Sequence, residues 1–484
     1  MKKKKLLLLS LSLLGIGTTS VGANQLDSLD NTKEMCSSIT ETKKTNNFND
    51  NKEEAKKWAD NFFKSFNNFL STSQKNSIKE IKQLEEAMLW RGSDLSKYDQ
   101  TDPNYNFLKK NIENIKKALS ANKGSLTESL VVYKTVSIED YFKMPTSFFF
   151  NSDTETNKEH IEELQDQLYG GFLPALHSFE LTNNGVSSND NTNKIKLELT
   201  LPKGTNTGFI DSNSIFIQDS YAFETDQISV VTEKNKKYIK VQAHLVPREQ
   251  VQKIVDTDEA AANILLNDSL ELPSETKLVD FNFEGLTATI GSKRALIAIN
   301  DFLKNEKMSD DLKKELMESM ITNPKGGGLV FTDLFFSVLE QAQGIVGVPS
   351  DKELSGLTLI HPDYPSYSFI QSPGFAKNQA DTYLARNSPA GYLAHELGHR
   401  FDAMCGDGIP YTFKYHLTFG PIFDFESAKA SWSARQKPAE FWAEVFRYKY
   451  SQDPSVSHLF DNEGNFRETK KIFKKELKEL GIEE

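Results

Sequence analysis

The stretch SPAGYLAHELGHRFDAMCG, residues 388–406, carries the strongest structural signal in this chain. Ser388 suits the N-cap of a helix, Gly406 suits a C-terminal stop, and apolar residues recur between them at roughly helical spacing. The stretch therefore predicts a helix. On that helix His395 and His399 lie four residues apart and share one face.

The two histidines and the carboxylate between them match the requirements of zinc chemistry. Neutral imidazole ligates zinc, zinc brings the pKa of a water toward neutrality, and a nearby carboxylate can take the proton of that water. The pattern predicts His395 and His399 as metal ligands and Glu396 as the general base of peptide hydrolysis by a zinc-activated water. The alternative is a chance match on an amphipathic helix.

A catalytic zinc site needs a third protein ligand. A metzincin would carry glycine and histidine where this chain has Asp402 and Cys405, so a nearby third ligand is excluded. Further along, residues 438–446 (PAEFWAEVF) predict a second helix with two carboxylates one turn apart. Glu440 can ligate while Glu444 orients a ligand histidine. A solvated acidic edge is the alternative, but bulky apolar neighbours argue against it.

Together, LAHELGHRFD at 393–402 and AEFWAEVFR at 439–447 resemble the anthrax lethal factor-like zinc metallopeptidase family, whose members include clostridial Pro-Pro endopeptidases. The resemblance covers roughly residues 276–484. It implies a secreted toxin or virulence factor with Zn²⁺ as cofactor. By position it also implies these roles: zinc ligands His395, His399 and Glu440, general base Glu396, and orienting carboxylate Glu444.

One departure from that family concerns the group that stabilises the tetrahedral intermediate. Members of the family carry a tyrosine shortly before the ligand glutamate, whereas residues 431–437 (SWSARQK) contain none. Tyr411 or Tyr415 could take the role, and the sequence leaves the oxyanion stabiliser unassigned.

The start of the chain predicts the compartment. Lys2 to Lys5 form a basic region, Leu6 to Ile16 an apolar region, and Val21-Gly22-Ala23 a cleavage signal, which together indicate a secretory signal peptide over residues 1–23. An uncleaved anchor is the alternative. Residues 24–50 are polar and predict a flexible leader. We therefore expect a secreted, extracellular protein.

Composition favours a soluble globular protein of two or three domains, with 484 residues, 38% hydrophobic and 26% charged. The net charge of −11 would become about −15 after loss of the four lysines, so nucleic acid is not an expected partner. No other run has the length of a membrane span. Cys36 and Cys405 are too few for a disulfide scaffold. The expected partner is a protein or peptide substrate, with a host protein among the candidates.

The chain before the metal motifs predicts an α+β domain over residues 51–250. Helical periodicity extends to about Leu119, and four strand-like runs follow at 130–136, 195–201, 227–231 and 238–246. The apolar stripe that predicts the helical core is Trp58, Phe62, Phe63, Phe66, Phe69, Leu70, Ile78, Ile81, Leu84 and Leu89. Residues 251–275 predict a linker helix, and 276–484 a mainly helical metalloprotease domain with a small sheet.

Residues 51–250 also resemble the binary-toxin ADP-ribosyltransferases in the order of their segments, notably LVVYK at 130–134 and IKLELTLPKGT at 195–205. In that family an arginine, a Ser-Thr-Ser segment and a Glu-x-Glu pair carry NAD chemistry. The corresponding positions here hold Lys134, Ser178-Phe179-Glu180, and Glu224 with Asp226. Lysine lacks the bidentate fork of arginine, so these changes predict a degenerate transferase fold.

Two other functions stay open. The first is an ADP-ribosyltransferase exotoxin that acts with NAD on a host protein. The second is a non-catalytic delivery or adhesion protein in which both halves are degenerate. The intact set of His395, Glu396, His399 and Glu440 argues against the second.

Overall fold

The computed structural model describes most of the chain from Thr45 onward. The described residues are 45–88, 104–142, 146–166, 168–173, 177–183, 194–211, 213–217, 221–334, 336–342, 345, 348, 356–359, 365–372, 389–431, 435 and 437–482. The predicted signal peptide (1–23), residues 24–44 of the predicted leader and Cys36 therefore lie outside the described residues.

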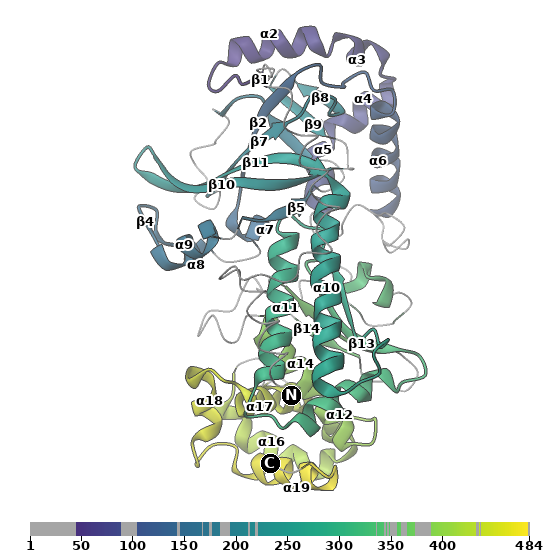
Figure 1. Cartoon of the computed structure of the whole chain (residues 1–484), viewed down its shortest axis with the longest axis vertical. Helices are drawn as coiled ribbons and strands as arrows, with labels where there is room; N and C mark the ends of the chain where they lie inside the picture. Colours follow the sequence, from purple (N-terminus) through teal and green to yellow (C-terminus); the bar gives the residue numbers. More distant parts are fainter. Residues whose placement is uncertain are drawn as a thin grey trace, which may run out of the picture. The chain divides into compact units, whose positions relative to one another are not determined.

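Helices dominate the first part of the described chain (Figure 1). They are α2 (Lys52–Phe62), α3 (Lys64–Phe69), α4 (Thr72–Lys79), α5 (Ile81–Met88) and α6 (Tyr105–Leu119). Most of the predicted apolar stripe is buried in one core, because its residues recur at helical spacing. Phe69 is the exception, since it is 51% exposed at the end of α3. Leu89 lies outside the described residues.

The described residues include the last part of the predicted leader. The predicted leader runs to residue 50, but β1 (Thr45–Asn46) pairs in parallel with β2 (Ser129–Val136). The physical reason is an apolar anchor in a polar stretch: Phe48 is buried, and its ring lies 5.4 Å from that of Trp58. Residues 45–48 of the predicted leader thus take part in the fold, and the limits of the leader stay a prediction.

A nine-stranded sheet follows, with the order β5-β10-β11-β7-β2-β6-β9-β8 and β1 beside β2. Its further strands are β5 (Gly170–Phe172), β6 (His177–Glu180), β7 (Ile195–Leu201), β8 (Thr207–Asp211), β9 (Ser214–Ile217), β10 (Tyr221–Glu233) and β11 (Lys236–Pro247). The smaller elements of this half are α7 (Ile138–Phe142), α8 (Thr146–Phe149), β3 (Phe150–Ser152), β4 (Glu155–Thr156) and α9 (Lys158–Asp166). The predicted α+β fold class is confirmed.

The strands β10 and β11 form one long antiparallel hairpin (Figure 1). Lys234 and Asn235 connect them, both with positive φ, 47° and 65°. Two central residues with positive φ match a type I′ turn, whose twist suits a two-residue hairpin. The prediction of two separate runs, 227–231 and 238–246, thus identified the middle of each strand but not their full lengths.

The second half begins with the helix α10 (Arg248–Leu270), which lies alongside α11 (Ala288–Lys304) (Figure 1). A four-stranded sheet has the order β12-β13-β15-β14, with the bounds β12 (Val279–Asn282), β13 (Gly327–Thr332), β14 (Gly356–Thr358) and β15 (Ser366–Gln371). The remaining helices are α12 (Asp310–Ile321), η5 (Phe336–Val338), η6 (Glu340–Ala342), α14 (Pro389–Cys405), α15 (Tyr411–Lys414), α16 (His416–Glu426), η7 (Ser427–Lys429), α17 (Pro438–Tyr450), α18 (Pro454–Asp461) and α19 (Arg467–Glu479).

Main-chain contacts join the two halves at strand β5. The N–H of Gly170 donates to Oγ1 of Thr289 at 2.8 Å, and that hydroxyl lies 3.1 Å from the Gly170 carbonyl. The N–H of Phe172 donates to the carbonyl of Gly285 at 2.9 Å. Residues Thr45–Glu484 accordingly form one compact unit, and the predicted domain limits at 250 and 276 stay a prediction.

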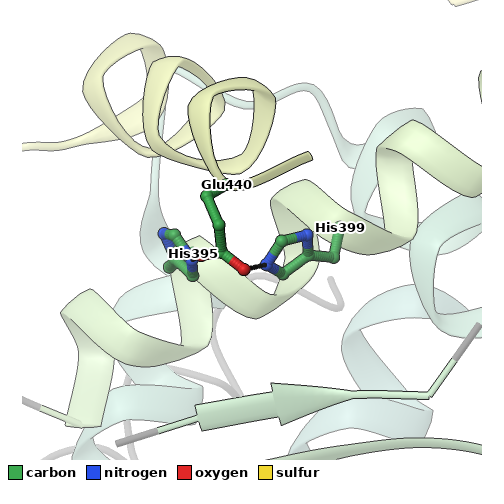
Figure 2. Close-up of side chains that lie close together, drawn as sticks. All are labelled: His395, His399 and Glu440. Carbon is green, nitrogen blue, oxygen red and sulfur yellow. Dashed lines mark hydrogen bonds and ion pairs between the residues drawn. The ribbon is translucent and has the colours of Figure 1, made fainter. Parts of the chain in front are cut away.

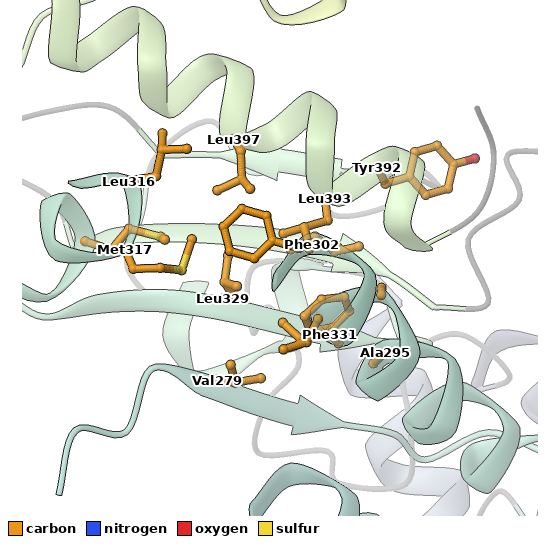
Figure 3. Close-up of a cluster of buried hydrophobic side chains, with 14 of the residues drawn as sticks. Val279, Ala295, Phe302, Leu316, Met317, Leu329, Phe331, Tyr392, Leu393 and Leu397 are labelled. Carbon is orange, nitrogen blue, oxygen red and sulfur yellow. The ribbon is translucent and has the colours of Figure 1, made fainter. Parts of the chain in front are cut away.

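Helix α14 is anchored by its apolar face to the core of the second half. Leu393 and Leu397 from α14 point toward Leu329 and Phe331 of β13 and toward Phe302 of α11 (Figure 3). These side chains are nearly or fully buried, and burial of one such side chain contributes roughly 1.5–3 kcal/mol. The helix is thereby fixed with its histidines on another face.

Among the described residues, no helix is both long enough and apolar enough to cross a membrane.

Candidate metal centre

The three predicted metal ligands come from two helices that pack against each other. His395 and His399 lie one turn apart on α14, and Glu440 lies in the first turn of α17. Figure 2 shows the Glu440 side chain reaching between the two imidazole rings. The helix α14 begins at Pro389 and ends directly before Gly406, where the sequence predicts its ends, although Ser388 lies outside the described residues.

The distances between these side chains suit a single zinc ion. His395 Nε2 lies 3.3 Å from Glu440 Oε2, and His399 Nε2 lies 3.8 Å from Glu440 Oε1. One potential ligand atom from each residue lies within 4.8 Å of the others. Two ligands at about 2.0–2.1 Å from a tetrahedral zinc are roughly 3.4 Å apart. The two distances from Glu440 therefore match a shared zinc ion to within a few tenths of an ångström, and all three ligand atoms lie within 4.8 Å of one another.

A glycine permits the close approach of the two helices. A Cβ atom at Gly398 would lie 2.6 Å from Cα of Ala443 on α17, closer than real Cβ atoms approach. The absent side chain at Gly398 lets α17 lie directly on α14, which brings Glu440 within reach of both histidines.

The charges of the site respond to burial and to one another. Burial lowers the pKa of His399 to about 3, so this imidazole is neutral, as a ligand must be. Burial also disfavours a charge on His395, but its contacts with Glu440 and Glu444 raise its pKa to about 9. Burial opposes ionisation of Glu440, yet the two histidines hold its pKa at about 2. Metal binding at His395 must therefore displace a proton.

Glu444 is buried and lies on the Nδ1 side of His395, whereas Glu440 lies on the Nε2 side. Its Oε2 is 3.3 Å from His395 Nδ1, and its Oε1 pairs with the guanidinium of Arg447 one turn further along α17. Burial alone would raise the pKa of Glu444, but Arg447 and His395 hold it well below its usual range. An ionised carboxylate here accepts the Nδ1 proton of His395 and leaves Nε2 free to face Glu440.

Glu396 is also buried, at 3% exposure, and contacts the small sheet. Thr358, the last residue of β14, donates a hydrogen bond to Glu396 Oε2 at 2.6 Å. Burial is the main reason that the pKa of Glu396 is raised to about 7. A carboxylate with that pKa can both accept and release a proton near neutral pH.

The two tyrosines considered for oxyanion stabilisation lie toward the end of α14, away from the histidines. Tyr411 is buried with its ring 5.2 Å from that of Trp442, and Tyr415 packs on Tyr411 at 4.5 Å. Burial raises the pKa of Tyr411, and the nearby carboxylate of Glu476 on α19 raises it further. Neither tyrosine contacts the metal ligands in any recorded hydrogen bond or ring pair of the described residues. Residues 432–434 and 436, in the segment where the family carries its tyrosine, lie outside the described residues.

Three contacts of the site were not anticipated. Thr358 binds Glu396, Arg447 binds Glu444, and Arg400 donates to the carbonyl of Leu359 at 3.0 Å. The Glu444–Arg447 pair could have been found from its i, i+3 spacing on a helix. The other two contacts join α14 to a strand region about 40 residues away and leave no local signal.

The transferase-like positions form a separate cluster with internal partners. Lys134 pairs with Glu85 of α5 and donates to the carbonyl of Ser178 at 3.0 Å, while the Ser178 hydroxyl donates to Glu85 at 2.7 Å. Burial opposes the charge of Glu85, but Lys134 and other donors hold its pKa at about 2. His177, 2% exposed, lies 3.2 Å from Glu85 and stays neutral, because burial lowers its pKa to about 3.

The two carboxylates at the transferase-like positions, Glu224 and Asp226, also have partners within the protein. Glu224 accepts a hydrogen bond from Gln250 at 2.7 Å, and Asp226 lies 2.8 Å from Nδ1 of His244. The register of β10 against β11 shifts between Thr225 and Gln227, beside these two carboxylates.

Comparison with known proteins supports both resemblances. Residues 55–255 match the family model described as ADP-ribosyltransferase exoenzyme. Lethal factor of Bacillus anthracis is 23% identical over 353 residues, which cover 71% of this chain and 42% of that protein. This chain thus spans less than half the length of that relative.

Two solved structures are also similar to this chain. Plx2a, an ADP-ribosyltransferase toxin from Paenibacillus larvae, is 20% identical, with 41% of this chain and 98% of that chain covered and a TM-score of 0.35. The ADP-ribosylating toxin BECa of a binary enterotoxin of C. perfringens is 21% identical, with 57% and 62% covered and a TM-score of 0.36. The chain is therefore similar to lethal factor and contains an ADP-ribosyltransferase exoenzyme-like segment, as its sequence predicts.

Proposed function

We propose that this chain is a secreted zinc-dependent metalloendopeptidase that acts as a toxin or virulence factor. The observation that carries the proposal is the meeting of His395, His399 and Glu440 within 4.8 Å. Glu396 and Glu444 stand beside them, where a general base and an orienting carboxylate are needed. The similarity to lethal factor supports the same class of function.

Zinc bound by these three residues would polarise the scissile carbonyl and make water a nucleophile near neutral pH. Glu396 accepts the proton of the attacking water on a carboxylate oxygen and later delivers it to the leaving amine nitrogen. Glu444 holds the Nδ1 proton of His395, so the ring keeps one orientation throughout. The buried position of Glu396 excludes bulk water that would otherwise compete for its proton.

The extended substrate docks on the edge strand β14. This strand lies at the end of the four-stranded sheet and contacts α14. An end strand offers main-chain donors and acceptors to a peptide that adds to the sheet. The identity of the cleaved protein depends on side-chain pockets around that strand.

The test uses purified chain on a peptide library at defined zinc, with metal content measured by elemental analysis. Glu396→Ala should retain zinc and lose cleavage, and His399→Ala should lose zinc. Glu315→Ala, at an exposed site on α12, is the matched control and should behave like the wild-type protein. Cleavage that persists in a chelator, or in Glu396→Ala at the wild-type rate, would overturn the proposal.

A second candidate function is ADP-ribosyl transfer from NAD, which the family match at residues 55–255 favours. The internal partners of Lys134, Ser178, Glu224 and Asp226 weigh against it, because these groups are already engaged. Measuring NAD hydrolysis with and without a zinc chelator separates the two candidates. Hydrolysis that is insensitive to the chelator would favour the transferase.

A further inference from the structure

We propose that Thr358 is a positioning residue that holds the Glu396 carboxylate for proton transfer, with Ser368 supporting it from the neighbouring strand. This inference rests on the proposed function, since it concerns the base of that reaction.

The hydrogen bonds around Thr358 have a defined direction. Its Oγ1 lies 2.6 Å from Glu396 Oε2, 3.0 Å from Ser368 Oγ and 3.2 Å from the Glu396 carbonyl oxygen. A threonine hydroxyl has one proton, and an ionised carboxylate can only accept. Because the shortest contact joins Thr358 to the carboxylate, the Thr358 proton is donated there. Ser368 then donates its own proton to Thr358 Oγ1.

The two hydroxyls lie on neighbouring strands, with Thr358 partly buried and Ser368 fully buried. Thr358 and Ser368 are directly opposite each other in the antiparallel register of β14 and β15, and Ser368 is fully buried. A hydrogen bond to a charged acceptor is stronger than one between neutral groups, and linked hydrogen bonds reinforce one another away from solvent. The sheet therefore fixes one oxygen of Glu396.

The second oxygen of Glu396 lies against the same strand at Gly356. A Cβ atom at Gly356 would overlap Glu396 Oε1. Since residues two apart share one face of a strand, Gly356 and Thr358 present the same face of β14 to the carboxylate. Gly356 supplies the space and Thr358 the hydrogen bond.

A positioning role predicts a specific kinetic pattern. Thr358→Val removes the hydroxyl and keeps the shape and β-branching of the side chain. It should lower kcat by roughly 10- to 150-fold, the range for loss of one hydrogen bond to a charged group. Zinc content should stay unchanged, because the hydrogen bonds of Thr358 go to Glu396 and Ser368 and not to the three proposed metal ligands. KM should also stay unchanged, because a peptide added to β14 pairs with main-chain groups, which the substitution keeps. Thr358→Ser keeps the hydroxyl and should restore kcat to within roughly threefold.

Thr332→Val provides the matched control. Thr332 is a buried threonine of β13 in the same sheet, and its hydroxyl donates to the carbonyl of Asn282 at 2.8 Å, not to Glu396. The control should lower the melting temperature without lowering kcat. An equal fall of kcat in Thr332→Val and Thr358→Val would show that Thr358 acts only through stability and would overturn the inference.

Crystal structures of the zinc-loaded variants give a readout that does not need turnover. The Glu396 side chain should leave its position in Thr358→Val and keep it in Thr358→Ser. An unmoved Glu396 in Thr358→Val, or a wild-type kcat in that variant, refutes the positioning role. Absence of zinc-dependent cleavage in the wild-type protein refutes instead the proposed function, and the position of Glu396 then decides the role of Thr358 alone.

Discussion

The contact between α14 and α17 makes Gly398→Ala the most informative substitution for the metal centre. The added methyl group would lie 2.6 Å from Cα, 2.8 Å from the carbonyl oxygen and 3.1 Å from the carbonyl carbon of Ala443. All three atoms belong to the α17 backbone, so no flexible side chain can move aside. The helices must separate, or the substituted protein must tolerate the strain.

The size of the effect follows from these distances. Ordinary contact begins at 3.4 Å, so α17 must retreat by about 0.8 Å at this point. Overpacking of this kind costs about 1–3 kcal/mol in folding free energy. Metal–ligand distances tolerate only about 0.2 Å, and Glu440 moves with α17. If about 1.4 kcal/mol of the strain is expressed in metal binding, zinc affinity falls tenfold.

The measurement combines thermal unfolding of the metal-free protein with a zinc titration. Gly398→Ala should melt at a lower temperature and bind zinc about tenfold more weakly. Gly420→Ala on α16 is the control, because a Cβ there meets nothing within 4 Å, and alanine is the better helix former by about 1 kcal/mol. Wild-type melting and zinc affinity in Gly398→Ala would refute the close-approach argument.

Other consequences can be measured separately. Glu440→Ala should abolish stoichiometric zinc binding by elemental analysis, since it removes the third ligand. Lys134→Ala should lower the free energy of unfolding by roughly 3–5 kcal/mol in denaturant titrations, because it leaves the buried Glu85 carboxylate without its main partner. Between pH values of about 6.5 and about 3, His177 is protonated in the unfolded state but not in the folded state. Calorimetry should therefore show that the free energy of unfolding is highest above pH 6.5 and falls as the pH is lowered through this window. A His177→Gln variant should flatten that decline. Ser309→Ala should cost about 1 kcal/mol in urea unfolding, because Ser309 caps α12 by accepting from the N–H of Leu312.

Local sequence patterns predicted the helices and strands whose apolar residues recur at helical or strand spacing. The run 195–201 coincides with β7 because its apolar residues alternate along the strand. The strand β5 was not predicted, since Gly170 and Gly171 have low strand propensity and form a strand only by pairing with β10. A Cβ at Gly171 would overlap the backbone of Leu286, so tertiary packing selects glycine there.

In the candidate site, too, local sequence patterns identify some residues, whereas other contacts depend on tertiary packing. The three candidate metal ligands could be found from the sequence because His395 and His399 share a helix face and Glu440 lies in the first turn of another helix. The contact between Thr358 and Glu396 could not, because it depends on where a three-residue strand packs against α14. The sequence alone predicts the candidate metal-binding and catalytic residues, but it does not predict the neighbouring side chains that orient them.

The main-chain contacts of β5 give the first half a role that is independent of any nucleotide. Removing residues 51–250 would strip the partners from Gly285 and Thr289, and a half cut away at β5 would expose strand edges prone to self-association. The hydrogen bonds of β5 thus make the transferase-like segment a structural support for its neighbour, independently of any enzymatic activity.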